Sequence, residues 1–171
     1  MIKQALISGA KSDEWYTPIE VVRTMLDVYP PKKGDRVLMP FDTDKSNFVK
    51  VITKEYDENA VYGITDFMTN TYDFDYLITN PPYSNKDEII ARCIESGKPC
   101  VLVLPIDALG GVQRHKLYSK TKISVYVPTK RIKFISENGE HKKSPANHSV
   151  IMMINAPKTE IIFEYQKEKL T

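Results

Sequence analysis

The feature that most constrains the fold is the alternation of short apolar runs with segments that carry apolar residues at helical spacing. Strands that alternate with helices in this way build a layered α/β fold. The apolar runs that predict strands are 36–41, 61–64, 74–79 and 99–104, and the helical segments are 19–28, 46–56 and 86–96. Three later runs, 123–127, 149–154 and 160–165, are expected to form the antiparallel end of the same sheet.

Capping and turn residues set the boundaries of these elements. Thr17 is expected to be the N-cap of the first helix, with Pro18 in its first turn. Gly97 is placed to close the helix over 86–96. The segments 107–118 and 136–146, rich in Gly, Asn and Lys, predict loops, the second with a tight turn near Asn138-Gly139.

The length of 171 residues predicts a single domain, and the composition is that of an ordinary globular protein. No apolar run approaches the length of a membrane span, and the first residues do not resemble a signal peptide. Neither the two cysteines, Cys93 and Cys100, nor the irregularly spaced histidines suggest a metal site. We therefore expect a cytoplasmic protein without a metal ion.

The tetrapeptide Asn80-Pro81-Pro82-Tyr83 follows the apolar strand that ends at Thr79. Ligands of open α/β sheets bind outside the carboxyl ends of strands, where this tetrapeptide is expected to lie. The Asn80 side chain and the Pro81 carbonyl can accept both hydrogens of a planar NH₂ group, while Tyr83 stacks on its ring. The plain alternative is a strand-to-loop turn, because Pro-Pro commonly ends strands.

This tetrapeptide resembles the catalytic motif of S-adenosylmethionine-dependent amino-methyltransferases, most often those that act on the exocyclic N6 of adenine in DNA. Small phage and prophage adenine methyltransferases are the most similar group. The resemblance implies a Rossmann-like methyltransferase fold, with a mixed sheet and helices on both faces. It also implies that Asn80, Pro81, Pro82 and Tyr83 are catalytic and that S-adenosylmethionine is the cofactor.

Earlier segments resemble the cofactor-binding motifs of that family. Trp15-Tyr16-Thr17-Pro18 is similar to the motif that closes over the methionine part of the cofactor, and Thr65-Asp66-Phe67 to the motif that contacts its adenine end. In the loop after the first strand, Asp42 and Asp44 can accept hydrogen bonds from an ammonium group. The cofactor residues expected from the resemblance are Tyr16, Thr17, Pro18, Phe41, Asp42, Asp44, Asp66 and Phe67.

Residues expected to bind substrate lie in the second half of the chain. Cations gather between residues 114 and 143, although the net charge is only +2. This distribution suits phosphate neutralisation and predicts DNA, or alternatively RNA, as the partner. The segment 130–134, followed by Ser144-Pro145 and the run 149–154, resembles the family segment that holds the flipped base. The expected substrate-binding residues are Lys130, Arg131, Lys133, Phe134 and His148.

The cofactor half departs from the family pattern in three ways. The loop over 39–47 contains no glycine, although a glycine-rich turn normally stands there. Between Phe41 and Asn80 there is room for one further strand rather than two, so that Glu55, Asp57 and Asp66 all stay candidates for the carboxylate that holds the cofactor ribose. No segment is long enough for a separate target-recognition domain.

Three functions therefore remain open. The leading hypothesis is methyl transfer from S-adenosylmethionine to the amino group of adenine in DNA. A second is an amino-methyltransferase that acts on RNA or on a protein glutamine, since the glutamine amide is another planar NH₂. The third is a non-enzymatic protein that keeps the fold but binds nucleic acid or a host protein.

Overall fold

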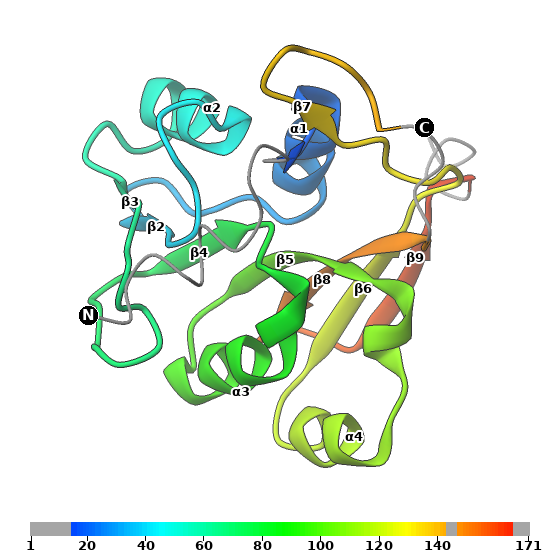
Figure 1. Cartoon of the computed structure of the whole chain (residues 1–171). Coiled ribbons are helices and arrows are strands. Elements are labelled where there is room, and N and C mark those ends of the chain that lie inside the picture. The colour runs from blue at the N-terminus through cyan, green and yellow to red at the C-terminus, as the bar shows by residue number, and fades with distance from the viewer. Residues whose placement is uncertain (1–14, 143–146, 166–171) are drawn as a thin grey trace.

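A seven-stranded sheet forms the centre of the computed structural model, which describes residues 15–142 and 147–165 (Figure 1). The strand order is β3-β2-β4-β5-β8-β6-β9. The strands are β2 (Val37–Met39), β3 (Val61–Tyr62), β4 (Tyr76–Thr79), β5 (Cys100–Pro105), β6 (Ile123–Val127), β8 (Ser149–Ile154) and β9 (Glu160–Phe163). Two further strands, β1 (Trp15–Tyr16) and β7 (Ile135–Ser136), pair antiparallel as a separate ribbon.

Strand β8 alone runs against the other six. It pairs antiparallel with β5 and with β6, whereas the remaining neighbours in the sheet are parallel. The predicted antiparallel end is therefore confirmed for β8, but it is wrong for β9, which lies parallel to β6 with Val125 opposite Ile161. As predicted, the chain between β2 and β4 forms only one further strand, β3.

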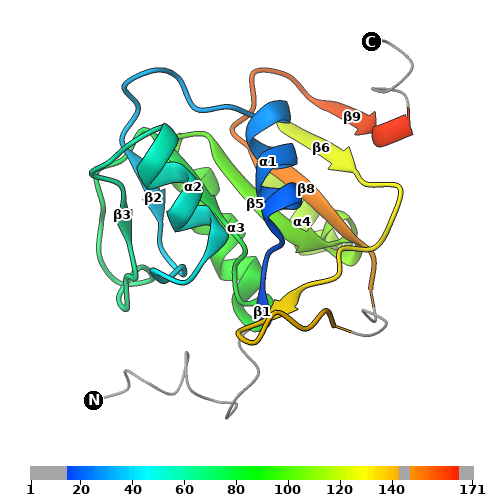
Figure 2. The same ribbon diagram turned by 90° about the horizontal axis from the view of Figure 1, so that it is seen from above.

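Helices cover both faces of the sheet and bury an apolar core on each. The helices are α1 (Ile19–Val28), α2 (Asn47–Glu55), α3 (Lys86–Ser96) and α4 (Val112–Tyr118), and α1 and α2 lie together on one side (Figure 2). Val22 and Phe48 belong to the core beneath α1 and α2, while Ile90 belongs to the core beneath α3. The predicted mixed sheet with helices on both faces is confirmed.

Local signals explain the helix ends, with one exception. Ser46 caps α2 by accepting a hydrogen bond from the Phe48 amide at 3.2 Å. Gly97 closes α3 with a φ of 66°, a left-handed conformation in which other residues are strained. The N-cap position of α1 is Pro18, not Thr17, and no side chain caps this helix. The prediction that Thr17 is the N-cap is therefore wrong, and the Thr17 hydroxyl makes no capping hydrogen bond.

The predicted loop over 107–118 is also wrong, because this segment contains the end of a 3₁₀ turn and the helix α4. Arg114 of α4 donates from Nε to Asp87 of α3 at 2.7 Å and from Nη1 to the carbonyls of Asp107 and Gly110 at 2.9 Å. The Arg114 charge thus stabilises the packing of α4. The predicted turn is present at Gly139, whose φ is 81°, and the rest of the second predicted loop, from residue 143 to 146, lies outside the described residues.

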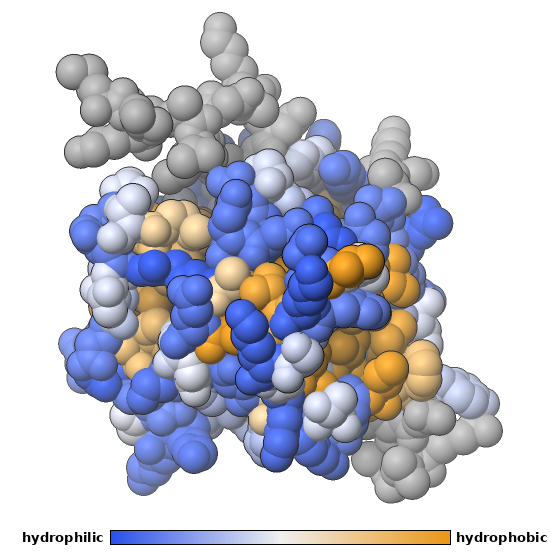
Figure 3. Space-filling view, turned by 90° about the horizontal axis from the view of Figure 1, so that it is seen from below, coloured by the Kyte–Doolittle hydropathy of each residue, from blue (hydrophilic) through white to orange (hydrophobic). Residues whose placement is uncertain are grey.

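The side of the molecule that carries α3 and α4 also exposes apolar side chains (Figure 3). Ile161 and Phe163 of β9 are 61% and 49% exposed, and they share one face of the sheet because side chains alternate along a strand. Across the described ranges, no helix has the length and apolar character needed to cross a membrane. The same ranges hold no group of three or more His, Cys, Asp or Glu side chains that would suit a metal ion.

Candidate active site at the strand ends

The strand order predicts a ligand crevice at the carboxyl ends of β2 and β4. Six strands run in one direction, so their carboxyl ends lie along one edge of the sheet. The connection that leaves β2 leads to α2 on one face, and the connection that leaves β4 leads to α3 on the other face. Two loops that diverge in this way open a ligand site between them. The loop 40–46 and the tetrapeptide 80–83 border this crevice.

Three buried polar atoms in this region have no hydrogen-bond partner. They are Asn80 Oδ1, Thr17 Oγ1 and Tyr83 Oη, and they are the full set of unpartnered buried side-chain nitrogen and oxygen atoms in the part of the chain that the structure describes. A buried polar atom without a partner costs about 1–3 kcal/mol. Such atoms are rare, and each calls for an explanation. A ligand that supplies donors to Asn80 and Thr17 explains why they are tolerated.

The tetrapeptide itself is held rigidly. Pro81 is buried, and the Pro82 carbonyl accepts a hydrogen bond from the Asn85 amide at 3.3 Å in the short turn Tyr83–Asn85. Burial raises the pKa of the half-buried Tyr83 to about 12, and the nearby Ser149 hydroxyl lowers it by less. The two hydroxyls lie close together without a hydrogen bond of normal geometry. The Tyr83 phenol is therefore neutral at physiological pH and has no role as a base.

The N-terminal segment reaches the crevice through α2. Asn47 Nδ2 donates to the Thr17 carbonyl at 2.9 Å, which joins the entry of α1 to the first turn of α2. The preceding strand β1 pairs with β7, so that Tyr16 lies opposite Ile135. Lys142 lies over the Trp15 ring at 5.5 Å from its centroid. Thr17 is thus held between the start of α2 and the second half of the chain.

Asp42 and Asp44, both expected to accept from a cofactor ammonium, differ in their surroundings. Asp42 is 8% exposed, and its two oxygens accept from Thr79 Oγ1 at 2.6 Å and from Ser46 Oγ at 2.7 Å. Burial raises the pKa of this carboxyl to about 7, against the lowering effect of the two hydrogen bonds. Asp44 is exposed. Asp44 is therefore the acidic side chain that this loop presents at its surface, whereas Asp42 is an internal link.

The structure selects among the three candidates for the ribose carboxylate. Glu55 forms an ion pair with Arg23, and Asp57 Oδ2 accepts from the Val37 amide at 2.9 Å at the start of β2. Both therefore lie toward the amino ends of the strands, away from the crevice. Asp66 follows β3 at the carboxyl edge, where it accepts from the hydroxyl of Tyr72. Of the three, only Asp66 lies at the carboxyl edge of the sheet.

The loop that contains Asp66 packs against the loop after β2. The Ile64 amide donates to the Pro40 carbonyl at 2.8 Å, and the rings of Phe41 and Phe67 meet edge to face with centroids 5.3 Å apart. Phe67 is buried, and Arg92 lies over its ring at 5.1 Å. The structure thus brings the expected residues Phe41, Asp66 and Phe67 together at the end of β2. This strand pairs with β4, which leads to Asn80.

Residues expected to bind substrate lie farther along the same edge, after β6. Lys130, Arg131 and Lys133 are exposed, whereas Ile132, which lies among them, and Phe134, which follows them, are buried. The three cations line a groove of about 560 Å³ against the first turns of α1, together with Glu20, Thr24, His141 and Glu164. The basic segment therefore has an open surface that a phosphate chain can reach.

Two of the expected substrate contacts have other partners. The Phe134 ring is 9% exposed and belongs to the core beneath α1 and α2. It has little surface left for a base, so the stacking role expected of Phe134 does not fit this conformation. His148 Nε2 donates to the Pro128 carbonyl at 2.8 Å, and the His148 carbonyl accepts from the Ile106 amide at 2.9 Å. These bonds hold the ends of β5, β6 and β8 together.

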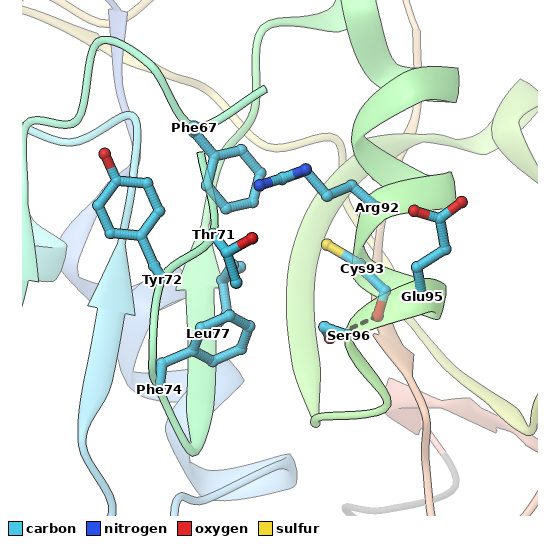
Figure 4. A pocket seen from close by; sticks show the side chains of 9 residues that line it. All are labelled: Phe67, Thr71, Tyr72, Phe74, Leu77, Arg92, Cys93, Glu95 and Ser96. Carbon is cyan, nitrogen blue, oxygen red and sulfur yellow. Dashed lines mark hydrogen bonds between the residues drawn. The ribbon is translucent and has the colours of Figure 1, made fainter. Parts of the chain in front are cut away.

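A second, smaller pocket of about 190 Å³ lies on the α3 side of the sheet (Figure 4). Phe67, Tyr72 and Phe74 form one wall, and Arg92, Cys93 and Ser96 of α3 face them. Neither Asn80 nor Thr17 lines this pocket. It is separate from the crevice, and it marks the place where the connection between β3 and β4 lies against α3 without a helix of its own.

The sequence did not reveal that Thr79, Ser46 and Asn47 connect the parts of this site. Thr79 precedes the tetrapeptide, Ser46 caps α2 and Asn47 is the first residue of α2. Two of these links join residues that are distant in the chain, since 37 residues separate Asp42 from Thr79 and 30 separate Thr17 from Asn47, whereas Ser46 lies four residues from Asp42. The signal that the sequence did contain is the pair of polar residues Thr79 and Asn80 at the point where the strand meets the tetrapeptide.

Comparison with solved structures identifies the fold. The chain superposes on the modification subunit of a putative type I restriction enzyme from Vibrio vulnificus with a TM-score of 0.58 and 12% identity, over 93% of this chain and 48% of that one. It matches a dimethyladenosine transferase from Plasmodium falciparum (TM-score 0.53, 15% identity, 82% and 62% covered). It also matches a predicted O-methyltransferase from Agrobacterium tumefaciens (0.52, 8%, 84% and 84%).

No protein-family model and no curated protein matches the sequence. The chain spans about half the length of the Vibrio subunit. At these identities, the structural likeness defines the architecture and not the reaction. The chain has an α/β Rossmann-like methyltransferase fold that is shortened by one strand between β2 and β4.

Proposed function

We propose that this protein transfers a methyl group from S-adenosylmethionine to the exocyclic amino group of adenine in DNA. The observation that carries the proposal is the buried, unpartnered Oδ1 of Asn80 at the mouth of the β2–β4 crevice. An acceptor in this position matches a substrate that brings its own N–H donors. The methyltransferase fold and the tetrapeptide that contains Asn80 support the same reaction.

The residues around the crevice fit the cofactor. Asp66 lies at the carboxyl end of β3, where it is placed to hold the ribose, and Asp44 offers an exposed carboxylate to the ammonium. The buried Thr17 hydroxyl has no partner of its own and is placed to bind the methionine part. When bound, S-adenosylmethionine supplies an electrophilic methyl group on a sulfonium, and the S–CH₃ bond breaks as the N–CH₃ bond forms.

The contribution of the protein is alignment and polarisation. Asn80 Oδ1 and the Pro81 carbonyl accept the two amino hydrogens, which keeps the nitrogen lone pair directed toward the methyl group. No strong base is needed, because the amino proton becomes acidic as the methyl transfers and leaves to solvent. Tyr83 presents its ring to the base, which offsets part of the few kcal/mol that base eversion costs.

A nucleic acid is the class of substrate that the charge distribution favours. The exposed Lys130, Arg131 and Lys133 line a groove beside the entry of α1, and the expected partner of such a row of cations is a phosphate backbone. Their nearest acidic neighbours in the groove are Glu20 and Glu164.

The test is an incubation of the protein with cofactor labelled in the methyl group, together with DNA, RNA and a mixed protein extract in separate reactions. Label recovered from DNA as N6-methyladenine supports the proposal. Label only in RNA or only in protein assigns the same chemistry to another substrate. Bound cofactor with no transferred label would contradict the proposed activity and favour a non-enzymatic binding role.

A further inference from the structure

The buried carboxylate of Asp42 links the two loops that border the crevice. Oδ2 accepts from Thr79 Oγ1 at 2.6 Å, and Oδ1 accepts from Ser46 Oγ at 2.7 Å. Asp42, Ser46 and Thr79 are all buried. A hydrogen bond to a charged group is roughly twice as strong as one between neutral groups. The carboxylate therefore fixes both hydroxyls firmly.

Each of these hydroxyls belongs to a residue next to the site. Thr79 is the last residue of β4, directly before Asn80. Ser46 caps α2, and the next residue, Asn47, holds the carbonyl of Thr17. The three segments expected to form the active site are thus connected through one carboxylate. In a loop that lacks glycine, this network replaces the close backbone approach that a glycine-rich turn would give.

We infer that Asp42 is a positioning residue, whose carboxylate orients Asn80 through Thr79 and whose negative charge makes the crevice favour a cationic ligand. The first half of this inference concerns the protein alone. The second half rests on the proposed function, because the sulfonium of S-adenosylmethionine is the cation in question.

The Asp42 carboxyl is poised to change its charge near neutral pH. Burial raises its pKa to about 7, and the hydrogen bonds from Thr79 and Ser46 limit the rise. The charged side chains nearest to it in the loop are Asp44 and Lys45, which are both exposed, and Lys45 forms an ion pair with Glu137. A positive ligand in the crevice favours the ionised carboxylate, so that binding near pH 7 releases a proton to solvent.

The positioning role is tested without any ligand. The ¹⁵N and ¹H resonances of the Asn80 side-chain amide are followed from pH 5 to pH 9, with the folded state checked by the dispersion of the backbone signals. We expect these resonances to titrate with a midpoint near 7, and we expect the titration to vanish in Asp42→Asn. The exposed Asp44→Asn is the matched control and should leave the titration unchanged. Asn80 side-chain resonances that are the same in the parent and in Asp42→Asn at every pH would overturn the positioning role.

Thr79 provides a second test of the same link. Thr79→Val removes the hydroxyl but keeps the shape, whereas Thr79→Ser keeps the hydroxyl. We expect Thr79→Val to abolish the response of Asn80 to the charge of Asp42 and Thr79→Ser to retain it. Methyl transfer in Thr79→Val should fall by roughly 10- to 100-fold, as expected for a misplaced reacting group. Equal behaviour of the two variants would contradict transmission through the hydroxyl.

The preference for a cation is tested by calorimetry at pH 7 in buffers of different ionisation enthalpy. S-adenosylmethionine is expected to release a measurable fraction of a proton and S-adenosylhomocysteine, which lacks the sulfonium, to release less. In Asp42→Asn both should release none. Equal release for the two ligands would overturn the charge preference. Absence of binding by either would overturn the proposed cofactor, while the amide titration of Asn80 would still decide the positioning role.

Discussion

At the scale of single residues, the polar atoms of the crevice divide into two kinds. Asp42, Ser46 and Thr79 satisfy one another and are structural, whereas Asn80 and Thr17 present buried oxygens without partners. The first group holds the second in place. This division explains why a chain that lacks the usual glycine-rich turn can still keep an ordered strand-end site.

Tyr83 allows the ring and the hydroxyl to be tested separately. Because its hydroxyl is buried without a normal hydrogen bond, Tyr83→Phe should leave the free energy of unfolding unchanged or raise it slightly. Tyr83→Ala removes the half-buried ring and should cost about 2–4 kcal/mol, near the values for truncated aromatic side chains. Urea denaturation measures both. Methyl transfer should survive in Tyr83→Phe and be lost in Tyr83→Ala. Loss of activity in Tyr83→Phe would mean that the hydroxyl takes part in the reaction.

Asp42 should give the protein a specific pH dependence of stability. Its folded-state pKa is raised to about 7 from an ordinary value of 3.8, so that the folded state holds the proton more tightly than the unfolded state. The contribution of this carboxyl is therefore most favourable in acid and is lost as the pH rises from about 4 to about 7, by about 1.4 kcal/mol per unit of pKa shift.

The comparison that isolates this effect is the free energy of unfolding of the parent and of Asp42→Asn at pH 5 and at pH 8. We expect the parent to lose stability relative to Asp42→Asn between these two values. The other carboxylates titrate alike in both proteins and cancel in the difference. A difference in unfolding free energy that stays constant between pH 5 and pH 8 would show that Asp42 is ionised in the folded protein throughout this range, which would contradict the raised pKa.

At the scale of elements, the residues best predicted from sequence are those whose structure depends on local signals. The bounds of α1, α3, β6 and β8 match the predicted ranges, because apolar spacing and Gly97 determine them locally. The predictions from sequence are wrong for elements whose packing partners are distant in the chain. β9 pairs parallel with β6, and α4 is tied to α3 by the contact between Arg114 and Asp87. Neither pairing has a local signature.

The basic segment 130–133 is the element expected to hold nucleic acid. Each phosphate contact adds close to one unit to the slope of log affinity against log salt concentration. Replacing Lys130, Arg131 and Lys133 by Gln should therefore flatten that slope by about two to three and weaken binding to all sequences alike. Fluorescence anisotropy of a labelled DNA duplex over a range of salt concentrations measures the slope.

The matched control is the triple replacement of Lys32, Lys33 and Lys54 by Gln, which removes the same charge from exposed positions at the amino-end side of the sheet. This control should leave the slope near that of the parent. If both triple variants flatten the slope equally, binding follows the net charge of the protein and has no defined track across the groove.

At the scale of the whole molecule, the sequence predicted the fold class and the single strand between β2 and β4, since length and apolar patterning determine both. It also predicted which segments would meet at the strand ends, because parallel strands bring their carboxyl ends together. It could not predict that Phe134 would be buried in the core or that Glu55 and Asp57 would lie at the opposite edge. These positions depend on how helices close over the sheet, which only the folded chain shows.

The proposed function requires that the strand-end crevice binds the cofactor. It also requires that Asn80 acts only on the reacting amino group. A residue with that role should affect turnover far more than cofactor affinity. Asn80→Asp keeps an acceptor, whereas Asn80→Ala removes it without disturbing the core, because Asn80 Oδ1 has no protein partner to lose.

The measurement is the rate of methyl transfer to DNA adenine in a single turnover, taken together with the cofactor dissociation constant, for the parent, Asn80→Asp and Asn80→Ala. We expect Asn80→Ala to lose transfer by roughly 100-fold or more, the order seen when one stabilising group is removed, with cofactor affinity and unfolding free energy close to the parent. Asn80→Asp should lie between the two. Transfer by Asn80→Ala at the parent rate, with cofactor still bound, would contradict the account.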